Sequence, residues 1–192
     1  FALPDYDKYD LSSLRAAVIS GSAAPIETLR KIKETMCDNC YNCLGLTEVS
    51  GLITYTEKGA SLETLNLTVG KVAPDFEMKL VDENRQEVPR GQIGEIAYRG
   101  TSVIKEYFKL PDVTAASFDD EGWFYSGDMG FIDEDGNLRM VGRSKDMYIT
   151  NGENIYPAEV EDAIMRYPGV MLCAVVGVPH EIAGHVGRAY IV

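Results

Sequence analysis

Four short segments of the chain carry residues whose types suit the binding of phosphates, hydroxyl groups or a hard cation. Residues 20–25 read SGSAAP, residues 45–48 read GLTE, residues 125–128 read YSGD and residues 142–146 read GRSKD. Small residues allow a close backbone approach, and a strand-to-helix turn favours anions. A Thr hydroxyl can donate to a phosphate, and a carboxylate can hold Mg²⁺ or accept ribose hydroxyls. Taken singly, each segment is also compatible with an ordinary turn, helix cap or solvated linker.

A run of cysteines offers a second kind of chemistry. Residues 37–43 read CDNCYNC, a spacing that could hold a metal or an iron–sulfur cluster. A tetrahedral site needs a fourth ligand, and Cys173 and both histidines stand far away in the sequence. We therefore favour buried or half-buried structural thiols on a strand that follows a helix, kept reduced in a cytosol-like compartment.

The composition excludes several classes of protein. The 192 residues carry a net charge of −12, and 45% of them are hydrophobic, which is ordinary for a globular protein. The acidic balance argues against binding to nucleic acid or to a membrane surface. No apolar run approaches the roughly 20 residues that span a bilayer. No secretory signal is visible, so a cytoplasmic location is expected.

The elements that would position these segments fall into three parts, which we divide at residues 1–68, 69–144 and 145–192. In the first part, an apolar run at 14–20, a helix opened by Pro25 and a strand at 38–44 predict a strand–helix–strand unit of a parallel α/β sheet. The apolar stripe of that helix comprises Ile26, Leu29, Ile32 and Met36.

The second part alternates short apolar runs with turn residues, which predicts a small, mostly antiparallel barrel or sandwich. Its strands are expected at 77–82, 94–99, 122–125, 130–133 and 138–141. Residues 133–137, DEDGN, predict a hairpin turn, and residues 111–118 a short helix.

In the third part, a helix at 157–167 begins at a proline and turns Val160, Ile164 and Met165 inward. Strands follow at 170–178 and from 187 to the end. The chain starts without Met and ends inside an apolar strand, so we expect that N-terminal and C-terminal parts of the protein are missing.

The order of these motifs resembles the adenylate-forming, AMP-binding superfamily, and most of all its acyl-CoA synthetases. The motifs GWFYSGDMG at 122–130 and GRSKDMYITNGENIYPAEVE at 142–161 are long and specific, and the likeness covers nearly the whole chain. The resemblance implies the end of a parallel α/β subdomain, a small β-barrel-like subdomain and an incomplete α+β C-terminal lid domain.

The same resemblance assigns roles to individual residues. It places Gly21, Ser22 and Ala23 in a loop beside adenine, with Leu44 and Gly45 nearby, Leu44 where the family often has an aromatic ring. It makes Thr47 the contact to the AMP phosphate and Glu48 the Mg²⁺ ligand. It assigns Asp128 and Arg143 to contacts with the ribose and Met140 to the nucleotide pocket. It makes Lys145 the hinge residue and places Gly152 beside the pantetheine channel.

The implied activity uses ATP, Mg²⁺ and coenzyme A to convert a carboxylic acid, here expected to be a fatty acid, into acyl-AMP and then a thioester. An adenylation domain that loads a carrier protein, and a non-catalytic remnant that binds a nucleotide or a partner, are the alternatives. Residues 184–185 read Gly-His where many members have Gly-Glu. The family's phosphate loop and C-terminal lysine are absent from this sequence, so the isolated piece is expected to be inactive.

Overall fold

The computed structural model describes residues 1, 3–21 and 25–192. Ser22 and Ala23 of the predicted adenine loop therefore lie outside the described residues. The chain separates into two compact units. The first unit comprises Phe1–Glu77, Arg99–Thr114 and Asp133–Arg139, and the second comprises Met78–Tyr98, Ala115–Ile132 and Met140–Val192. Among the described residues, no helix combines the length and the apolar character needed to cross a bilayer.

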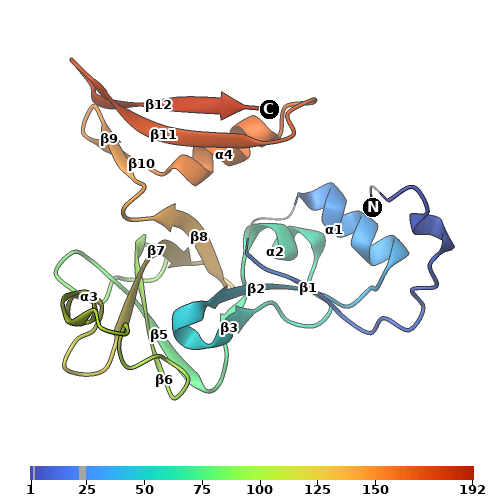
Figure 1. Ribbon diagram of the computed structural model, residues 1–192, viewed down its shortest axis with the longest axis horizontal. Coiled ribbons are helices and arrows are strands. Elements are labelled where there is room, and N and C mark those ends of the chain that lie inside the picture. Colours follow the sequence, from blue (N-terminus) through green and yellow to red (C-terminus); the bar gives the residue numbers. More distant parts are fainter. Residues whose placement is uncertain (2, 22–24) are drawn as a thin grey trace. The chain divides into compact units, whose positions relative to one another are not determined.

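The first unit contains a four-stranded sheet in the order β1-β2-β3-β4 (Figure 1). Its elements are η1 (Tyr6–Lys8), β1 (Ala17–Ile19), α1 (Ile26–Thr35), β2 (Cys40–Leu46), η2 (Thr47–Val49), β3 (Gly51–Tyr55), α2 (Leu62–Leu67) and β4 (Lys71–Val72). Because β1 and β2 are parallel, the predicted strand–helix–strand unit is confirmed. Pro25 is the N-cap of α1 rather than a residue of its first turn.

The core of this unit is a cluster of Leu29 from α1, Cys40 from β2 and Leu65 from α2. Ile32 packs against the cluster, but Ile26 is exposed. The predicted stripe is therefore correct over the middle of the helix and wrong at its first residue. The helix begins at Ile26, one turn before the Leu29 contact with the core.

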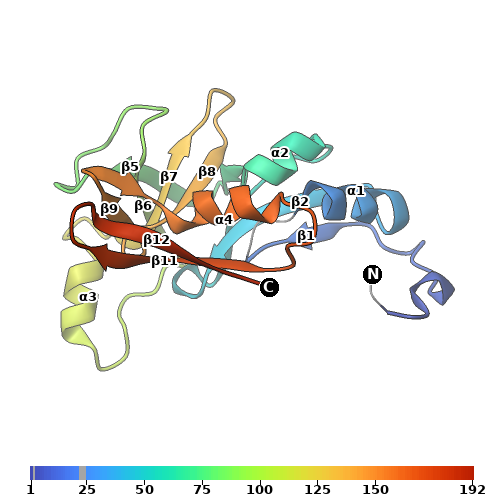
Figure 2. The ribbon, with the colours of Figure 1, turned by 90° about the horizontal axis from the view of Figure 1, so that it is seen from above.

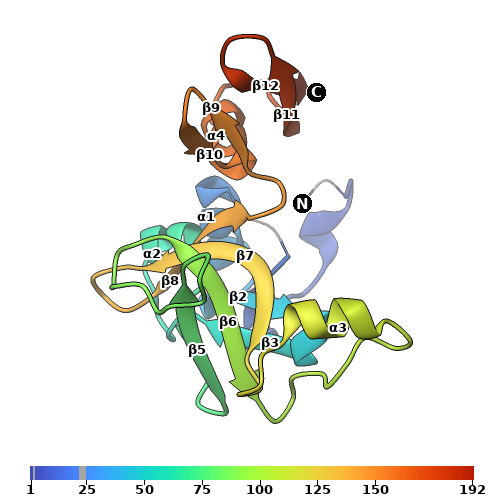
Figure 3. The same cartoon turned by 90° about the vertical axis from the view of Figure 1, so that its left-hand side faces the viewer.

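A second four-stranded sheet has the order β5-β6-β7-β8, and most of its residues belong to the second unit (Figure 3). The strands are β5 (Phe76–Val81), β6 (Gly94–Gly100), β7 (Phe124–Ile132) and β8 (Leu138–Arg143), and α3 (Pro111–Ser117) precedes β7. The predicted β-rich part is thus confirmed, but in the part of the chain that the structure describes it is one open sheet and not a closed barrel. The predicted hairpin turn is also confirmed, because Asp133 N–H donates to the carbonyl of Asn137 and Gly136 has a φ of 83°.

Two details of this sheet differ from the prediction. The strands expected at 122–125 and 130–133 are one strand, β7, which continues through the SGD motif. A bulge makes this possible, because β6 advances from Glu95 to Ala97 while β7 runs from Met129 back to Tyr125. In addition, β8 extends to Arg143, so Gly142 and Arg143 are strand residues and the connector begins after them.

The C-terminal part of the second unit is a sheet in the order β10-β9-β12-β11, with α4 packed against β11 (Figure 2). Its elements are β9 (Tyr148–Thr150), β10 (Glu153–Ile155), α4 (Pro157–Met165), β11 (Cys173–His180) and β12 (Gly184–Ile191). The predicted helix is confirmed, with its proline at the first position. Met165 is 36% exposed and not turned inward as expected, because it is the last residue of the helix. The three-part division of the chain stays a prediction.

Candidate functional site

The first group of predicted site residues follows β2 in the first unit. The strand ends at Leu46, and Thr47 and Glu48 begin the short helix η2. Thr47 is exposed and Glu48 is half-buried. This places a hydroxyl and a carboxylate directly at the end of a strand, which is where α/β sheets bind their ligands.

Glu48 is held by two hydrogen bonds from one loop. The Tyr107 hydroxyl donates to Glu48 Oε1 at 3.0 Å. The Ile104 N–H donates to the Glu48 carbonyl oxygen at 2.8 Å. Among the described residues, no three acidic, Cys or His side chains gather as a metal cluster. A lone carboxylate still fits Mg²⁺, which keeps several waters and is bound by one or two carboxylates together with substrate phosphates.

Three other predicted residues of the first unit have a local structural explanation. Gly45 must be glycine, because a Cβ there would come within 2.6 Å of the Gly51 carbonyl oxygen on β3. The register between β2 and β3 shifts between Leu44 and Gly45, and Leu44 is half-buried. Gly21 has a φ of +88° and open space around it, so the turn conformation alone explains the residue.

The second group of site residues lies in the second unit, where the structure brings together Asp128 and Arg143. Arg143 Nε lies 2.9 Å from Asp128 Oδ1. The Asp128 side chain is 5% exposed and that of Arg143 is 51% exposed. A buried carboxylate is therefore held beside a cation that reaches solvent, a combination suited to a polar, hydroxylated ligand.

The bulge in β7 positions the Asp128 carboxylate. Gly127 has a φ of 74°, and its N–H donates to Glu95 Oε1 at 2.8 Å. The Ser126 hydroxyl donates to the Ile96 carbonyl oxygen at 2.7 Å and accepts from the Asp128 N–H at 3.1 Å. Sequence reasoning identified Asp128 but missed Glu95 and Ser126, because no spacing signal connects β6 to β7.

Tyr98 is a further buried neighbour of this carboxylate. In the part of the chain that the structure describes, its hydroxyl is the one buried side-chain polar atom with no hydrogen-bond partner. Burial raises the pKa of Tyr98 far above its usual value, and the negative charge of Asp128 adds to this effect. Tyr98 is therefore neutral at physiological pH.

The remaining predicted residues lie around the connector. Met140 is half-buried on β8, Lys145 is exposed in the turn that follows β8, and Gly152 is exposed in the turn between β9 and β10. Asn151 and Gly152 have φ values of 52° and 88°, which is the signature of a tight hairpin turn. This turn joins β9 to β10, which begins at Glu153.

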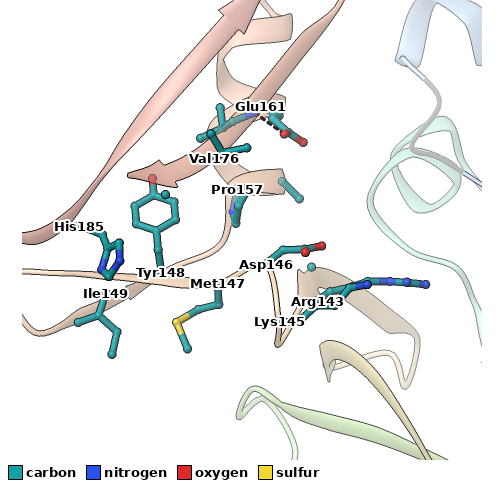
Figure 4. Close-up of a pocket in the computed structure, with 14 residues that line it drawn as sticks. Arg143, Lys145, Asp146, Met147, Tyr148, Ile149, Pro157, Glu161, Val176 and His185 are labelled. Atoms are coloured by element: carbon teal, nitrogen blue, oxygen red, sulfur yellow. Dashed lines mark hydrogen bonds between the residues drawn. The ribbon is translucent and has the colours of Figure 1, made fainter. Parts of the chain in front are cut away.

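A cavity of about 740 Å³ lies beside this connector in the second unit (Figure 4). Arg143 at the end of β8 and Lys145 and Asp146 from the connector line it, together with Tyr148 and His185 from the C-terminal sheet. Glu161 also lines it and accepts a hydrogen bond from the Val175 N–H at 2.7 Å. The wall carries both signs of charge, so it is not a simple anion site.

The cysteine run has the features of structural thiols. Cys37, Cys40 and Cys43 are 9%, 1% and 4% exposed. On a strand, residues three apart point to opposite faces, so Cys40 and Cys43 of β2 cannot share one ion. The Cys40 thiol instead donates to the Cys37 carbonyl oxygen at 3.4 Å, and burial raises the pKa of both strand thiols.

A Thr-Glu pair at a strand end, a buried carboxylate beside an arginine and a small C-terminal sheet with one helix are the features expected of an adenylate-forming protein. The chain belongs to the AMP-binding enzyme family, whose model matches residues 2–108. The model of the AMP-binding enzyme C-terminal domain matches residues 159–192.

Individual relatives agree with this assignment. The chain is 40% identical to the putative acyl-CoA synthetase YngI of Bacillus subtilis, over 98% of this chain and 35% of that protein. It is 34% identical to a long-chain-fatty-acid–CoA ligase of Escherichia coli, over 98% of this chain and 33% of that protein. The amide bond synthetase McbA of Marinactinospora thermotolerans superimposes with a TM-score of 0.87 and 31% identity, over 99% of this chain and 38% of McbA. The chain thus spans about a third of the length of the curated relatives it matches.

Proposed function

We propose that the full-length protein is an ATP-dependent acyl-CoA synthetase. It activates a carboxylic acid as acyl-AMP with release of pyrophosphate, and it then transfers the acyl group to the thiol of CoA with release of AMP. The single observation that carries this proposal is the 2.9 Å pair of buried Asp128 and half-exposed Arg143, two residues that the family resemblance assigns to the ribose. The relatives named as acyl-CoA ligases support the same reaction.

The chemistry requires a carboxylate to attack the α-phosphate of ATP while negative charge builds up on the phosphate oxygens. Thr47 donates its hydroxyl to that phosphate, and Glu48 holds Mg²⁺, which neutralises charge when bound. Asp128 accepts hydrogen bonds from the ribose hydroxyls, and Arg143 fixes the Asp128 carboxylate and contacts the ribose. We propose these roles for the four residues in the full-length protein.

The other assigned residues complete the proposed site. The residues assigned to adenine are Gly21, Ser22 and Ala23, with Leu44 and Gly45, and Met140 is assigned to the nucleotide pocket. Lys145 is the pivot between the two half-reactions, and Gly152 borders the pantetheine arm of CoA. We further propose the division at 1–68, 69–144 and 145–192, which the C-terminal family model over 159–192 supports.

A fatty acid is the proposed acyl substrate. The support is the similarity to the long-chain-fatty-acid–CoA ligase of Escherichia coli. The test compares kcat/KM for saturated fatty acids of increasing length with that for aromatic acids. Higher values for the aromatic acids would overturn the fatty-acid assignment and leave the adenylation chemistry in place.

A different acceptor is the second candidate function. The likeness to the amide bond synthetase McbA, with a TM-score of 0.87, favours it. An amine would then attack the acyl-AMP in place of a thiol. Supplying the full-length enzyme with CoA, a carrier protein or a simple amine, and identifying the product by mass spectrometry, distinguishes these acceptors.

The decisive assay is exchange of labelled pyrophosphate into ATP in the presence of a carboxylic acid. We expect the full-length enzyme to support exchange. Because hydrogen bonds to a charged group contribute substantially, Asp128→Asn is expected to raise the KM for ATP about tenfold. Absence of exchange with every acid tested would favour a non-catalytic remnant, and an unchanged KM in Asp128→Asn would remove Asp128 from the nucleotide site.

A further inference from the structure

The hydrogen bond between Tyr107 and Glu48 joins residues 59 positions apart in the sequence. Both side chains are half-buried in the first unit. The bond engages Oε1 of Glu48 at 3.0 Å. A carboxylate has two oxygens and about four acceptor positions, so this bond restricts the rotation of the carboxylate while leaving capacity for a cation.

Tyr107 is itself held in place by its own loop and by the helix α3 that follows it. Its N–H donates to the Thr114 hydroxyl oxygen at 2.9 Å. Its carbonyl oxygen accepts from the Leu110 N–H at 3.0 Å, and the Thr114 hydroxyl donates to the Leu110 carbonyl oxygen at 2.9 Å. These bonds fix the backbone from which the phenol reaches Glu48.

The same loop is tied to the backbone around Glu48. Ile104 donates its N–H to the Glu48 carbonyl oxygen at 2.8 Å. The Ser50 hydroxyl donates to the Ser102 carbonyl oxygen at 3.0 Å. Ser50 has a φ of 61°, a conformation that costs energy for a residue with a side chain. Loop 101–110 and the turn that carries Glu48 are therefore one connected assembly, with Tyr107 as its contact to the carboxylate.

We propose that Tyr107 is a positioning residue that sets the orientation of the Glu48 carboxylate for Mg²⁺ bound with ATP. The proposal rests on the proposed function, because it takes Glu48 as the metal ligand. Outer partners that hydrogen-bond a ligating carboxylate fix its geometry, and their loss typically weakens metal binding or activity about 10- to 100-fold. Tyr107 touches neither substrate nor metal and acts through Glu48.

The test uses the full-length enzyme and Tyr107→Phe, which removes only the hydroxyl. We expect the Mg²⁺ concentration for half-maximal pyrophosphate exchange to rise about tenfold. Calorimetric titration of Mg²⁺ into enzyme with a non-hydrolysable ATP analogue should show the same weakening without turnover. Tyr6→Phe is the control, because it also loses a hydrogen bond of a tyrosine hydroxyl, 3.0 Å long, with the Thr35 hydroxyl group. Its Mg²⁺ midpoint should stay at the wild-type value.

A double-mutant cycle separates positioning from general folding. In a Glu48→Gln background, Tyr107→Phe should have little further effect on Mg²⁺ binding. This is because Tyr107 acts through the Glu48 carboxylate, which that background lacks. An unchanged Mg²⁺ midpoint in Tyr107→Phe, or equal losses with and without Glu48, would overturn the proposal. Failure of the wild-type enzyme to exchange pyrophosphate would instead count against the proposed function. Thermal unfolding of each variant identifies any loss that comes from misfolding.

Discussion

Asp119 shows how a single carboxylate of the β-rich part is held in a charged state. Its Oδ2 accepts from the Tyr125 hydroxyl at 2.7 Å, and its Oδ1 accepts from the N–H groups of Trp123 and Glu121 at 2.9 and 3.0 Å. Burial by itself would raise the pKa of Asp119, but these hydrogen bonds outweigh it and lower the pKa. The ionised form therefore stabilises the fold.

The pKa of Asp119 predicts a loss of stability in acid. Its folded-state pKa is lowered, so its contribution is complete above the unfolded pKa of about 3.9 and disappears as the pH falls through the lower, folded value. Asp119→Asn should therefore lower Tm at neutral pH and flatten the decline of Tm below about pH 4. Thermal unfolding from pH 7 to pH 2 measures this. Asp120→Asn, at the exposed neighbouring position, is the control, and equal pH profiles for the two variants would contradict the prediction.

The four cysteines should differ in reactivity. The thiolate is the reactive form, and burial raises the pKa of Cys40 and Cys43. Cys173 is more exposed than the other three. We expect iodoacetamide to alkylate Cys173 first in the native protein and the other three only after unfolding, with peptide mass spectrometry as the readout. Early labelling of Cys40 would show that the β2 core opens.

At the scale of elements, a pair of glycines makes room for one aromatic ring. Gly177 on β11 and Gly187 on β12 are register partners. A Cβ at Gly177 would lie 2.5 Å from Cβ of Tyr148, and a Cβ at Gly187 would collide with the Tyr148 hydroxyl oxygen. Tyr148 on β9 is buried against the surface that these two glycines leave without side chains. The glycine pair therefore sets how the first strand after the connector packs in the C-terminal sheet.

This packing predicts a compensating pair of mutations. Gly187→Ala should destabilise the protein by about 1–3 kcal/mol through overpacking. Tyr148→Phe removes the atom that the new methyl group would meet, so the double variant should recover more than half of the loss. Urea unfolding of the two single variants and the double variant gives the coupling free energy between positions 148 and 187. If the changes in unfolding free energy of the two single variants simply add in the double variant, the Tyr148 ring moves away from the new methyl group without cost.

At the scale of the whole molecule, the connector after β8 is the segment that the family resemblance assigns as a hinge. Its turn is closed by hydrogen bonds from the N–H groups of Asp146 and Met147 to the Arg143 carbonyl oxygen, at 3.1 and 3.2 Å. Lys145 is exposed at this turn. An exposed turn between two sheets suits the pivot role that the family resemblance assigns to Lys145.

Restricting Lys145 should separate the two steps. Lys145→Pro fixes φ at this position and restricts Ser144 before it. We expect pyrophosphate exchange to stay within about threefold of wild type, while thioester formation falls about 100-fold because the second arrangement is misplaced. Lys145→Ala is the control and should retain both steps. Equal losses of both steps in Lys145→Pro would argue against a pivot.

Much of the local architecture could be predicted from the sequence because it depends on neighbouring residues. The Pro-initiated helix α4, the DEDGN turn and the parallel pairing of β1 with β2 follow from proline, glycine and apolar periodicity. The division of β7 into two strands was wrong, because glycine in SGD was interpreted as a turn. Only pairing with β6 shows that Gly127 belongs to a bulge inside one strand.

The sequence by itself determined the family resemblance and the periodic elements, since these depend on residue type and short spacing. It also supplied the proposed roles of Thr47, Glu48, Asp128 and Arg143. The tertiary structure alone decided which groups form hydrogen bonds with those side chains or with the backbone next to them. Tyr107 reaches Glu48 across 59 positions, and Glu95 reaches Gly127 across 32. Contacts over such distances depend on loop and strand placement, which leaves no regular spacing in the chain for a reader of the sequence to find.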